Sequence, residues 1–355
     1  MTTDELKKKY AEAETEINNI YVSTRAVSVV SYQAKTKKKT DAVLNGLRKS
    51  TTEYCEKEIP RIYQDSLEQL EADLQDVYER GEDWHIDRAK QSETIENAKE
   101  DTESKLIFAI ITAGLCLSAY TANASTQFDF KDVDGFRDSI LSQIANNGIN
   151  GGAYFRDGTI VNTNLSGYAD EVLQGVDTMV GNDAVVDTLM ANGWDLVKMS
   201  EHEDSCPICY PYQGRVYSLS GNSDEYPYLY DTGWSEEFQN FHPNCRHYLE
   251  PFFPDTQTPE RLEETKEYSN RSFEVGGEGW TKEQVDEANR MKDLYNAEQK
   301  KKQEIYSAKK QYDKYKAALG EKAPKSFNGF WRMKQADSEG YKTLKSEYLQ
   351  FMKAQ

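Results

Sequence analysis

Thiol and imidazole side chains are concentrated in one short part of this chain. Three of its four histidines and three of its five cysteines fall within the 46 residues from His202 to His247. Two residues separate Cys206 from Cys209, and two residues separate His242 from Cys245. Soft thiolates and imidazole at these spacings suit a tetrahedral Zn²⁺ ion. The spacing therefore predicts two metal-binding knuckles that are joined by one loop.

The two knuckles together supply a closed set of ligands. Three thiolates and one imidazole fill a tetrahedron and leave no position for a substrate, so we predict a structural zinc site. The predicted ligands are Cys206, Cys209, His242 and Cys245. The ion would clip the ends of a 32-residue loop, and closing a long loop brings the larger gain in stability in principle.

Two further histidines flank this set. His202 lies four residues before Cys206, and His247 lies two residues after Cys245. Either could take the place of His242, or could form hydrogen bonds at the edge of the site. The cysteines could also bind no metal and pack as small apolar side chains. A redox role for the Cys-x-x-Cys motif is less favoured, because no βαβ pattern surrounds it.

Catalytic signatures are missing from the sequence. It contains no G-x-S-x-G, P-loop, H-E-x-x-H or G-x-G-x-x-G pattern. The zinc deaminase signature fails because the triplet that begins at His202 ends in Asp204, where that signature requires Glu. One enzymatic alternative stays open, a zinc-dependent hydrolase or nuclease. It would need an open coordination position and a base such as Glu203 or Asp204.

Charge and cysteine usage narrow the class of protein. The chain has 355 residues, with 61 acidic and 43 basic residues and a net charge of −18. Such a chain can contain two or three domains, and nucleic acid and anionic membranes repel it overall. The five cysteines are not spaced as a disulfide framework, and the polar N-terminus shows no secretory signal. We therefore expect synthesis in a reducing compartment.

Helical patterns precede the Cys/His window. Up to about residue 125, apolar residues recur at steps of three and four among many charged ones. Examples are Ile59, Ile62, Tyr63, Leu67, Leu70, Leu74 and Val77. Pro60 could open one of these helices or kink the chain. Leu106 to Ala124 is uncharged and long enough to span a bilayer, but polar residues dilute its second half, so we predict a buried helix.

Short strands and one helix lead into the window. Residues 146–152 are rich in Asn and Gly and predict a turn, and a hairpin is predicted around Asp157-Gly158. A helix is predicted from Tyr168 to Ala191, ending at Asn192-Gly193. The predicted strands are Asp195 to Met199, Gly214 to Leu219 and Tyr248 to Phe253.

The chain becomes helical again after Trp280, and its charge changes sign. The part from Thr281 onward has 17 basic and 11 acidic residues, a net charge of +6. A basic helix that carries tyrosines could bind DNA phosphates, or it could be the solvated face of a docking helix. We predict a mainly α fold with a small α+β module, in which long terminal helices flank a central zinc-knuckle domain with short strands. The predicted divisions are 1–127, 128–260 and 261–355.

Several segments near the cysteines follow the pattern of one known family. They are Gly193 to His202, Ser205 to Cys209, Gln213 to Ser218 and His242 to His247, with Arg156 to Gly158 and Tyr168 to Val172 upstream. Together they resemble the minor capsid proteins of tailed phages that infect Gram-positive hosts, which are related to the Mu F-like head morphogenesis proteins. The chain departs from this family at Leu173 to Val176, where relatives commonly carry an Arg-Thr pair.

The resemblance implies a non-enzymatic virion protein. Such proteins are made in the bacterial cytoplasm and enter the phage head in small numbers, near the portal or the genome. The implied partners are the portal protein, the major capsid protein and packaged DNA, which the tail at 281–355 could contact. We expect no stable membrane insertion. The competing hypothesis is a membrane-associated ejection protein that uses Leu106 to Ala124.

Overall fold

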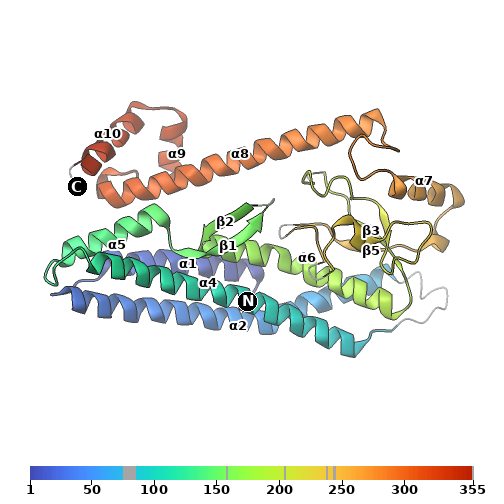
Figure 1. Cartoon of the computed structure of the whole chain (residues 1–355), viewed down its shortest axis with the longest axis horizontal. Coiled ribbons are helices and arrows are strands. Elements are labelled where there is room, and N and C mark those ends of the chain that lie inside the picture. Colours follow the sequence, from blue (N-terminus) through green and yellow to red (C-terminus); the bar gives the residue numbers. More distant parts are fainter. Residues whose placement is uncertain (75–84, 157–158, 204, 237–238, 243–244, 354–355) are drawn as a thin grey trace.

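The computed structural model describes residues 1–74, 85–156, 159–203, 205–236, 239–242 and 245–353. In these ranges the chain is mainly helical and carries small antiparallel sheets (Figure 1). The predicted fold class is confirmed at this level. Whether the central part is a zinc-knuckle domain stays a proposal.

An elongated helical body forms the lower part of the molecule in Figure 1. It consists of α1 (Thr3–Ser23), α2 (Val29–Asp73), α4 (Arg88–Ser125), α5 (Val133–Asn147) and α6 (Leu165–Ala191). Each helix has apolar residues three or four positions apart, so one face can be buried against its neighbours. The resulting core extends in sequence from Leu6 to Ala184 and therefore crosses residue 127. We call these five helices the helical body.

Side-chain caps fix where these helices begin. The Thr2 hydroxyl accepts the backbone N–H of Glu5, and the Glu5 carboxylate accepts that of Thr2, which is a capping box. Asp87 caps α4 and Asn164 caps α6 in the same position. Residues of the turns thus satisfy N–H groups that the helices themselves leave without partners.

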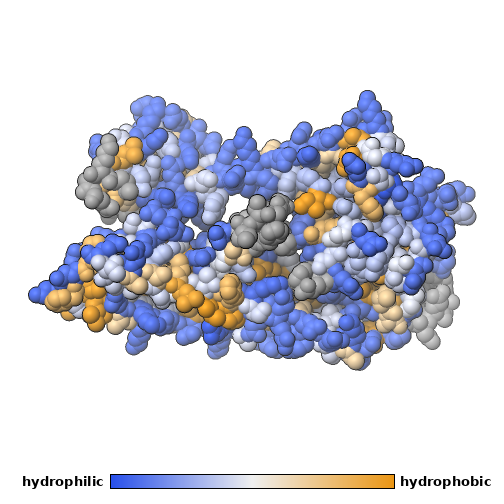
Figure 2. All heavy atoms as spheres, in the orientation of Figure 1, coloured by the Kyte–Doolittle hydropathy of each residue, from blue (hydrophilic) through white to orange (hydrophobic). Residues whose placement is uncertain are grey.

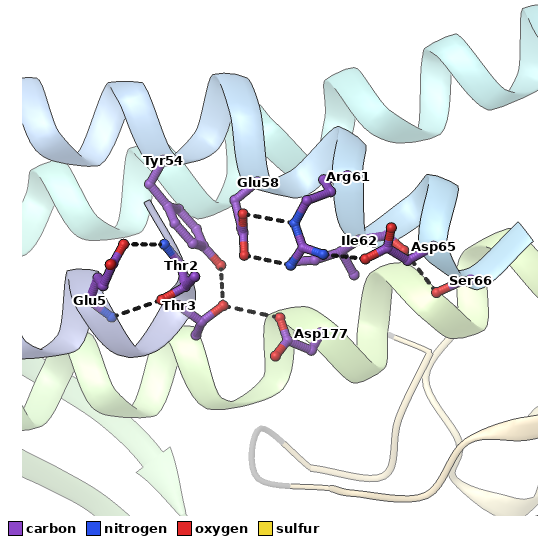
Figure 3. A network of polar contacts seen from close by, with 10 residues as sticks. All are labelled: Thr2, Thr3, Glu5, Tyr54, Glu58, Arg61, Ile62, Asp65, Ser66 and Asp177. Atoms are coloured by element: carbon purple, nitrogen blue, oxygen red, sulfur yellow. Dashed lines mark hydrogen bonds and ion pairs between the residues drawn. The ribbon is translucent and has the colours of Figure 1, made fainter. Parts of the chain in front are cut away.

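A polar network joins three helices of the body at the edge of its apolar core (Figure 3). The Thr3 hydroxyl lies 3.0 Å from the hydroxyl of Tyr54 and 3.1 Å from a carboxylate oxygen of Asp177, so it links α1 to α2 and α6. Nearby on α2, Arg61 pairs with Glu58 at 2.7 Å and also with Asp65. Buried polar groups need such partners, since each one left unsatisfied costs free energy.

The structure tests two expectations about the long helices. α2 continues through Pro60, which therefore lies inside the helix and does not open it; Val77 falls outside the described residues. Leu106 to Ala124 lies in α4, where one face is buried in the core. The other face exposes Phe108, Ile111 and Leu115. α4 is apolar and long enough to cross a membrane, with 28% of its most apolar window buried, so the absence of a span stays a prediction.

A hairpin connects α5 to α6 and packs on the body. β1 (Asn150–Arg156) pairs antiparallel with β2 (Thr159–Asn164), as predicted, and its turn at Asp157-Gly158 falls outside the described residues. The close packing of β1 requires Gly152. It has φ of +141°, and a Cβ atom there would approach the Tyr168 ring within 2.9 Å.

A small sheet follows α6 and carries the Cys/His window, at the right of Figure 1. α6 ends at Ala191 before Asn192-Gly193, as predicted. β3 (Leu196–Met199) is the central strand, with β4 (Val216–Ser218) on one side and β5 (Leu249–Pro251) on the other. All three strands fall inside the predicted segments but are shorter. We call residues 194–253 the Cys/His module; its loops include η1 (Leu229–Thr232).

The C-terminal part returns along the whole molecule. After η2 (Pro254–Thr256) and α7 (Pro259–Asn270), the 38-residue helix α8 (Lys282–Leu319) runs back beside the helical body to α5 (Figure 1). There η3 (Gly320–Lys322), α9 (Phe327–Gln335) and α10 (Glu339–Lys353) fold against the end of α8. Their small core contains Ala308, Tyr315, Phe330 and Leu344.

Candidate metal centre

The first knuckle is a tight turn in the loop between β3 and β4. The backbone N–H of Cys209 lies 3.1 Å from the carbonyl oxygen and 3.4 Å from the sulfur of Cys206. The N–H of Tyr210 donates to the same carbonyl at 2.9 Å. These bonds turn both thiols to the same side. The N–H directed at sulfur would stabilise a thiolate at Cys206.

A glycine lets the chain leave this knuckle and form β4. Gly214 has φ of +72°, and its N–H donates to the carbonyl of Met199 at 2.9 Å. A Cβ atom at this position would lie 2.1 Å from a carboxylate oxygen of Glu201. A left-handed conformation together with so little space favours glycine here. Gly214 thereby places the knuckle against the edge of the sheet.

Aromatic side chains support the loop between the knuckles. The ring of Phe241 lies 4.6 Å from that of Tyr212 and 5.2 Å from that of Trp234, and Tyr212 also stacks on Phe273 at 5.0 Å. The Tyr217 hydroxyl donates to the carbonyl of Tyr212 at 2.7 Å. Phe241 precedes the second knuckle directly, so this packing fixes the position of its histidine.

The second knuckle lies beside the first. The N–H of Cys245 donates to the carbonyl of His242 at 2.8 Å, which gives a turn with the same spacing as the first. Pro243 and Asn244, between these residues, lie outside the described residues. His247 follows two residues later, just before β5, and is almost fully buried.

The predicted ligands meet, but not as a single group of four. The sulfur atoms of Cys206 and Cys209 each lie 3.2 Å from Nε2 of His242. Cys209 also lies 3.8 Å from the sulfur of Cys245, which is 3.6 Å from Nδ1 of His247. The donors therefore form two overlapping groups of three that share Cys209. His247, an alternative ligand by sequence, belongs to one of these groups.

The three thiols differ in pKa, because they are hydrogen-bonded to one another. A hydrogen bond from Cys209, with a contribution from His242, lowers the pKa of Cys206 to about 4. A hydrogen bond from Cys209 likewise lowers the pKa of Cys245 to about 4, with a contribution from His247. The pKa of Cys209 is raised, because it donates to both and is buried. A cation would relieve this competition, since metal-bound cysteines are thiolates, so the donor set fits zinc.

The remaining candidates lie at the periphery. His202 accepts or donates through Nε2, which lies 3.1 Å from the Ser200 hydroxyl and from the carbonyl of Arg246. Its ring contacts that of His247 edge-on at 4.7 Å. Within the described part of the chain, His202 belongs to neither donor group. Glu203 is exposed, and Asp204, the other base of the enzymatic alternative, falls outside the described residues.

Sequence reasoning missed a buried asparagine that ties the site to the helical body. Asn182 on α6 donates to the carbonyls of Gln239 and His247, at 2.9 and 3.1 Å, and accepts the N–H of Leu249 at 2.9 Å. Its side chain thus contacts the loop before the second knuckle, the residue after it and β5. An amide on the buried face of a predicted helix was the available signal, because buried amides need partners.

Arg215, directly before β4, is the second residue that sequence reasoning missed. Its side chain is fully buried and donates to the backbone carbonyls of Ser269, Arg271 and Ser272, with the ring of Phe273 at 4.3 Å. Burial lowers the pKa of this guanidinium to about 10. Carbonyls at the end of α7 compensate the charge, as expected at a helix C-terminus. Arg215 therefore fastens the segment that leads into α8.

Comparison with known proteins places this arrangement in a family. Residues 134–335 match the family model described as phage minor capsid protein 2. The match begins in α5, includes the complete Cys/His module and ends in α9. No curated protein and no solved structure matches the chain. Because the matched region covers more than half of the sequence, this chain belongs to the phage minor capsid protein 2 family.

Proposed function

We propose that this protein is a structural component of a bacteriophage head that acts through assembly contacts near the portal or the genome. The observation that carries the proposal is the family match over residues 134–335. The fold supports it, because an elongated helical body with a second long helix beside it offers extended surfaces to neighbours. Assembly would take place in the cytoplasm of the bacterial host.

The proposal includes one structural zinc ion in the Cys/His module. Three thiols and two imidazoles form two overlapping donor groups that share Cys209, so the rotation of one side chain would supply all four ligands of a tetrahedral ion and leave no position for a substrate. The exposed carboxylate of Glu203 belongs to neither donor group among the described residues. These observations favour a structural ion over the hydrolase or nuclease alternative.

The end of the body where α1 turns into α2 is the surface we propose for a protein partner. Val22, Val27, Val30 and Phe130 are 54%, 94%, 67% and 59% exposed there, and Val29 bonds to the carbonyl of Phe130, which joins the two turns. Figure 2 shows orange side chains at this left end and along α4. We call these four residues the apolar tip. Exposed apolar groups of this kind mark contact sites.

The composition of the apolar tip favours a protein over a bilayer. Three of its residues are valines, whereas membrane-interface segments typically insert Trp and Tyr. From Ile17 to Thr40 the chain has five basic residues and no acidic one, although Asp129 and Asp132 lie on the adjoining turn. An apolar socket bordered by carboxylates on the portal or major capsid protein would complement this end.

Val27→Asp tests this surface. We expect the variant protein to remain folded, because Val27 is 94% exposed, but to be reduced at least tenfold in phage heads when quantified by mass spectrometry. Val275→Asp, at a site 37% exposed near α8, is the matched control and should be incorporated normally. Heads that contain none of the wild-type protein would refute the head assignment. Equal incorporation of the two variants would refute only the apolar tip, and binding of the wild type to liposomes would favour the membrane alternative.

Packaged DNA is the second proposed partner, through the middle of α8. Side chains from Lys292 to Ser307 are almost all exposed, and this stretch includes Lys300, Lys301 and Lys302. Phosphate contacts by lysines give binding that weakens steeply with salt. Replacing these three lysines by Gln should lower the salt dependence of DNA binding. Replacing Lys7, Lys8 and Lys9 on α1, with the same loss of charge, should not.

A further inference from the structure

We propose that His247, and not His242, completes the zinc site with Cys206, Cys209 and Cys245. This inference rests on the proposed zinc ion and specifies its ligands. Knuckle spacing favours His242, since His242-x-x-Cys245 has the same spacing as the cysteine pair. The hydrogen bonds, distances and burial of the two histidines favour His247.

The hydrogen bonds around His247 decide which of its nitrogens can bind a metal. Oε1 of Gln213 accepts the backbone N–H of His202 at 3.0 Å. A backbone N–H can only donate, so the amide atom at this point must be the oxygen. The same oxygen lies 3.2 Å from Nε2 of His247, which must therefore carry the proton. In a neutral imidazole this leaves the lone pair on Nδ1, the atom that faces Cys245.

Distances within the donor group of Cys209, Cys245 and His247 agree with this choice, and the thiol of Cys206, which lies outside that group, would turn towards it when the ion binds. Zinc bonds of about 2.3 Å to sulfur and about 2.0–2.1 Å to nitrogen give a tetrahedron with S···S edges of about 3.8 Å and S···N edges of about 3.6 Å. The distance from Cys209 to Cys245 is 3.8 Å, and that from Cys245 to Nδ1 of His247 is 3.6 Å. His242 approaches two sulfur atoms at 3.2 Å each, closer than a tetrahedral edge. That separation fits an imidazole N–H that donates to thiolates.

The burial and the neighbouring hydrogen bonds of the two histidines also favour His247 as the ligand. His247 is 3% exposed, and its carbonyl accepts a hydrogen bond from Asn182 at 3.1 Å. The next residue, Tyr248, is bonded to Ser200 through both its N–H and its carbonyl. His242 is only half-buried. A buried ligand whose neighbours are hydrogen-bonded to the sheet loses little freedom when it binds an ion, whereas a half-buried loop residue loses more.

His242 then has a separate role at the edge of the site. Three thiolates and one neutral imidazole leave a zinc centre with a net charge of −1. An N–H from His242 directed at Cys206 and Cys209 would stabilise this charge, as hydrogen bonds to ionised sulfur do. Gln213 is a positioning residue in this arrangement, because it acts on the metal through the tautomer of His247.

Metal content and affinity of the full-length protein separate the two histidines. We expect one zinc per chain in the wild type and in His242→Gln. In His247→Gln, zinc affinity measured by competition with a chromophoric chelator should fall at least tenfold. Gln213→Leu should also lower it, within the 10- to 100-fold range typical of residues that orient ligands. The cobalt-substituted His242→Gln protein should keep the wild-type tetrahedral absorption spectrum.

A measurement on the wild-type protein removes any dependence on whether the variants fold. In protein loaded with ¹¹³Cd and labelled with ¹⁵N at histidine, coupling to cadmium should appear at Nδ1 of His247 and not at His242. Coupling to His242 alone, or zinc lost from His242→Gln but kept in His247→Gln, would overturn the ligand choice and leave the zinc site intact. Two zinc ions per chain would also overturn it. A wild type that binds no metal would refute the proposed zinc site itself.

Discussion

The helical body and the Cys/His module are stabilised in different ways, although they are neighbours in one chain. The core of the body is a continuous set of aliphatic and tyrosine side chains from five helices. The module is built on strands of four, three and three residues, and its core includes Cys209, Cys245 and several aromatic rings. Burial of apolar surface can stabilise the body, whereas strands this short depend on added cross-links.

Because the two regions are stabilised differently, a single substitution should affect the stability of the module more than that of the body. In the body, apolar contacts are spread over many turns of helix, so each side chain carries a limited share of the stability. In the module, a few specific polar contacts and the proposed ion hold long loops in place. We therefore expect the body to stay folded after a single substitution, whereas a substitution at one of these contacts should disorder the module.

Loss of the proposed zinc ion should have the largest effect. Cys209 belongs to both donor groups, so Cys209→Ser should disorder residues 196–251, because binding of a structural zinc contributes on the order of 10 kcal/mol to folding. Amide exchange in the module should become fast, while exchange in α1, α2 and α4 stays slow. Cys55→Ser, at a buried cysteine of α2, is the control and should leave the module protected. Fast exchange in both regions would mean that the body needs the module to fold.

A cavity in the body should cost less and leave the metal in place. Ile59 on α2 is fully buried, so Ile59→Ala should lower the free energy of unfolding by about 2–5 kcal/mol. Zinc content should not change, because the side chain is not part of the module. Ile111→Ala, on the exposed face of α4, should cost less than about 0.5 kcal/mol. Urea titration followed by circular dichroism measures both, and zinc released by Ile59→Ala would contradict the separation of the two regions.

The two regions also differ in how far the sequence predicts them. Three- and four-residue spacing predicts helices along the body, and alternation at Asp195 to Met199 predicts β3, because both signals are local. The Cys-x-x-Cys spacing predicts that thiols meet at a turn for the same reason. The resemblance to phage minor capsid proteins rests on such local segments and is confirmed by the family match.

Contacts between residues far apart in sequence could not be predicted from the sequence. Nothing near Asn182 indicates that its amide bonds to Gln239, His247 and Leu249. The burial of Arg215 depends on carbonyls more than 50 residues away, and the orientation of His247 depends on an amide 34 residues earlier. Such contacts depend on how whole helices and strands pack against one another, and the local propensities of a sequence carry no information about that packing.

A change at the boundary between the two regions should have an intermediate effect. Asn182→Leu would leave two carbonyls and one N–H of the module without their partner, at a cost of about 1–3 kcal/mol for each buried group left unsatisfied. Water that enters the gap would reduce the total. Amide exchange should rise near β5 and the second knuckle before it rises in the helical body. Asn123→Ala on α4, which removes two exposed hydrogen bonds, to Gln143 and from Gln127, is the control and should leave exchange in the module unchanged.

The last effect is a dependence of stability on pH, and it concerns a carboxyl group where the body meets the module. Burial, reinforced by the nearby Asp187, raises the pKa of Asp183 on α6 to about 8, and Lys90 only partly offsets this. The folded protein therefore keeps a proton on Asp183 at pH values where the unfolded chain has lost it. This contribution to stability is present at low pH and is lost as pH rises from about 4 towards 8, at up to about 1.4 kcal/mol per pH unit.

Asp183→Asn should remove this pH dependence. The amide keeps the size of the carboxyl group and cannot ionise, so the stability of the variant relative to the wild type should grow as pH rises from 5 to 8, by at most about 1.4 kcal/mol per pH unit. The difference should shrink as pH approaches 5, where the wild type is protonated. Asp293→Asn on α8, an exposed site with the same change of charge, should track the wild type across this range. Thermal unfolding from pH 5 to 8.5 measures all three proteins, and parallel curves for wild type and Asp183→Asn would show that the carboxyl group ionises freely within the fold.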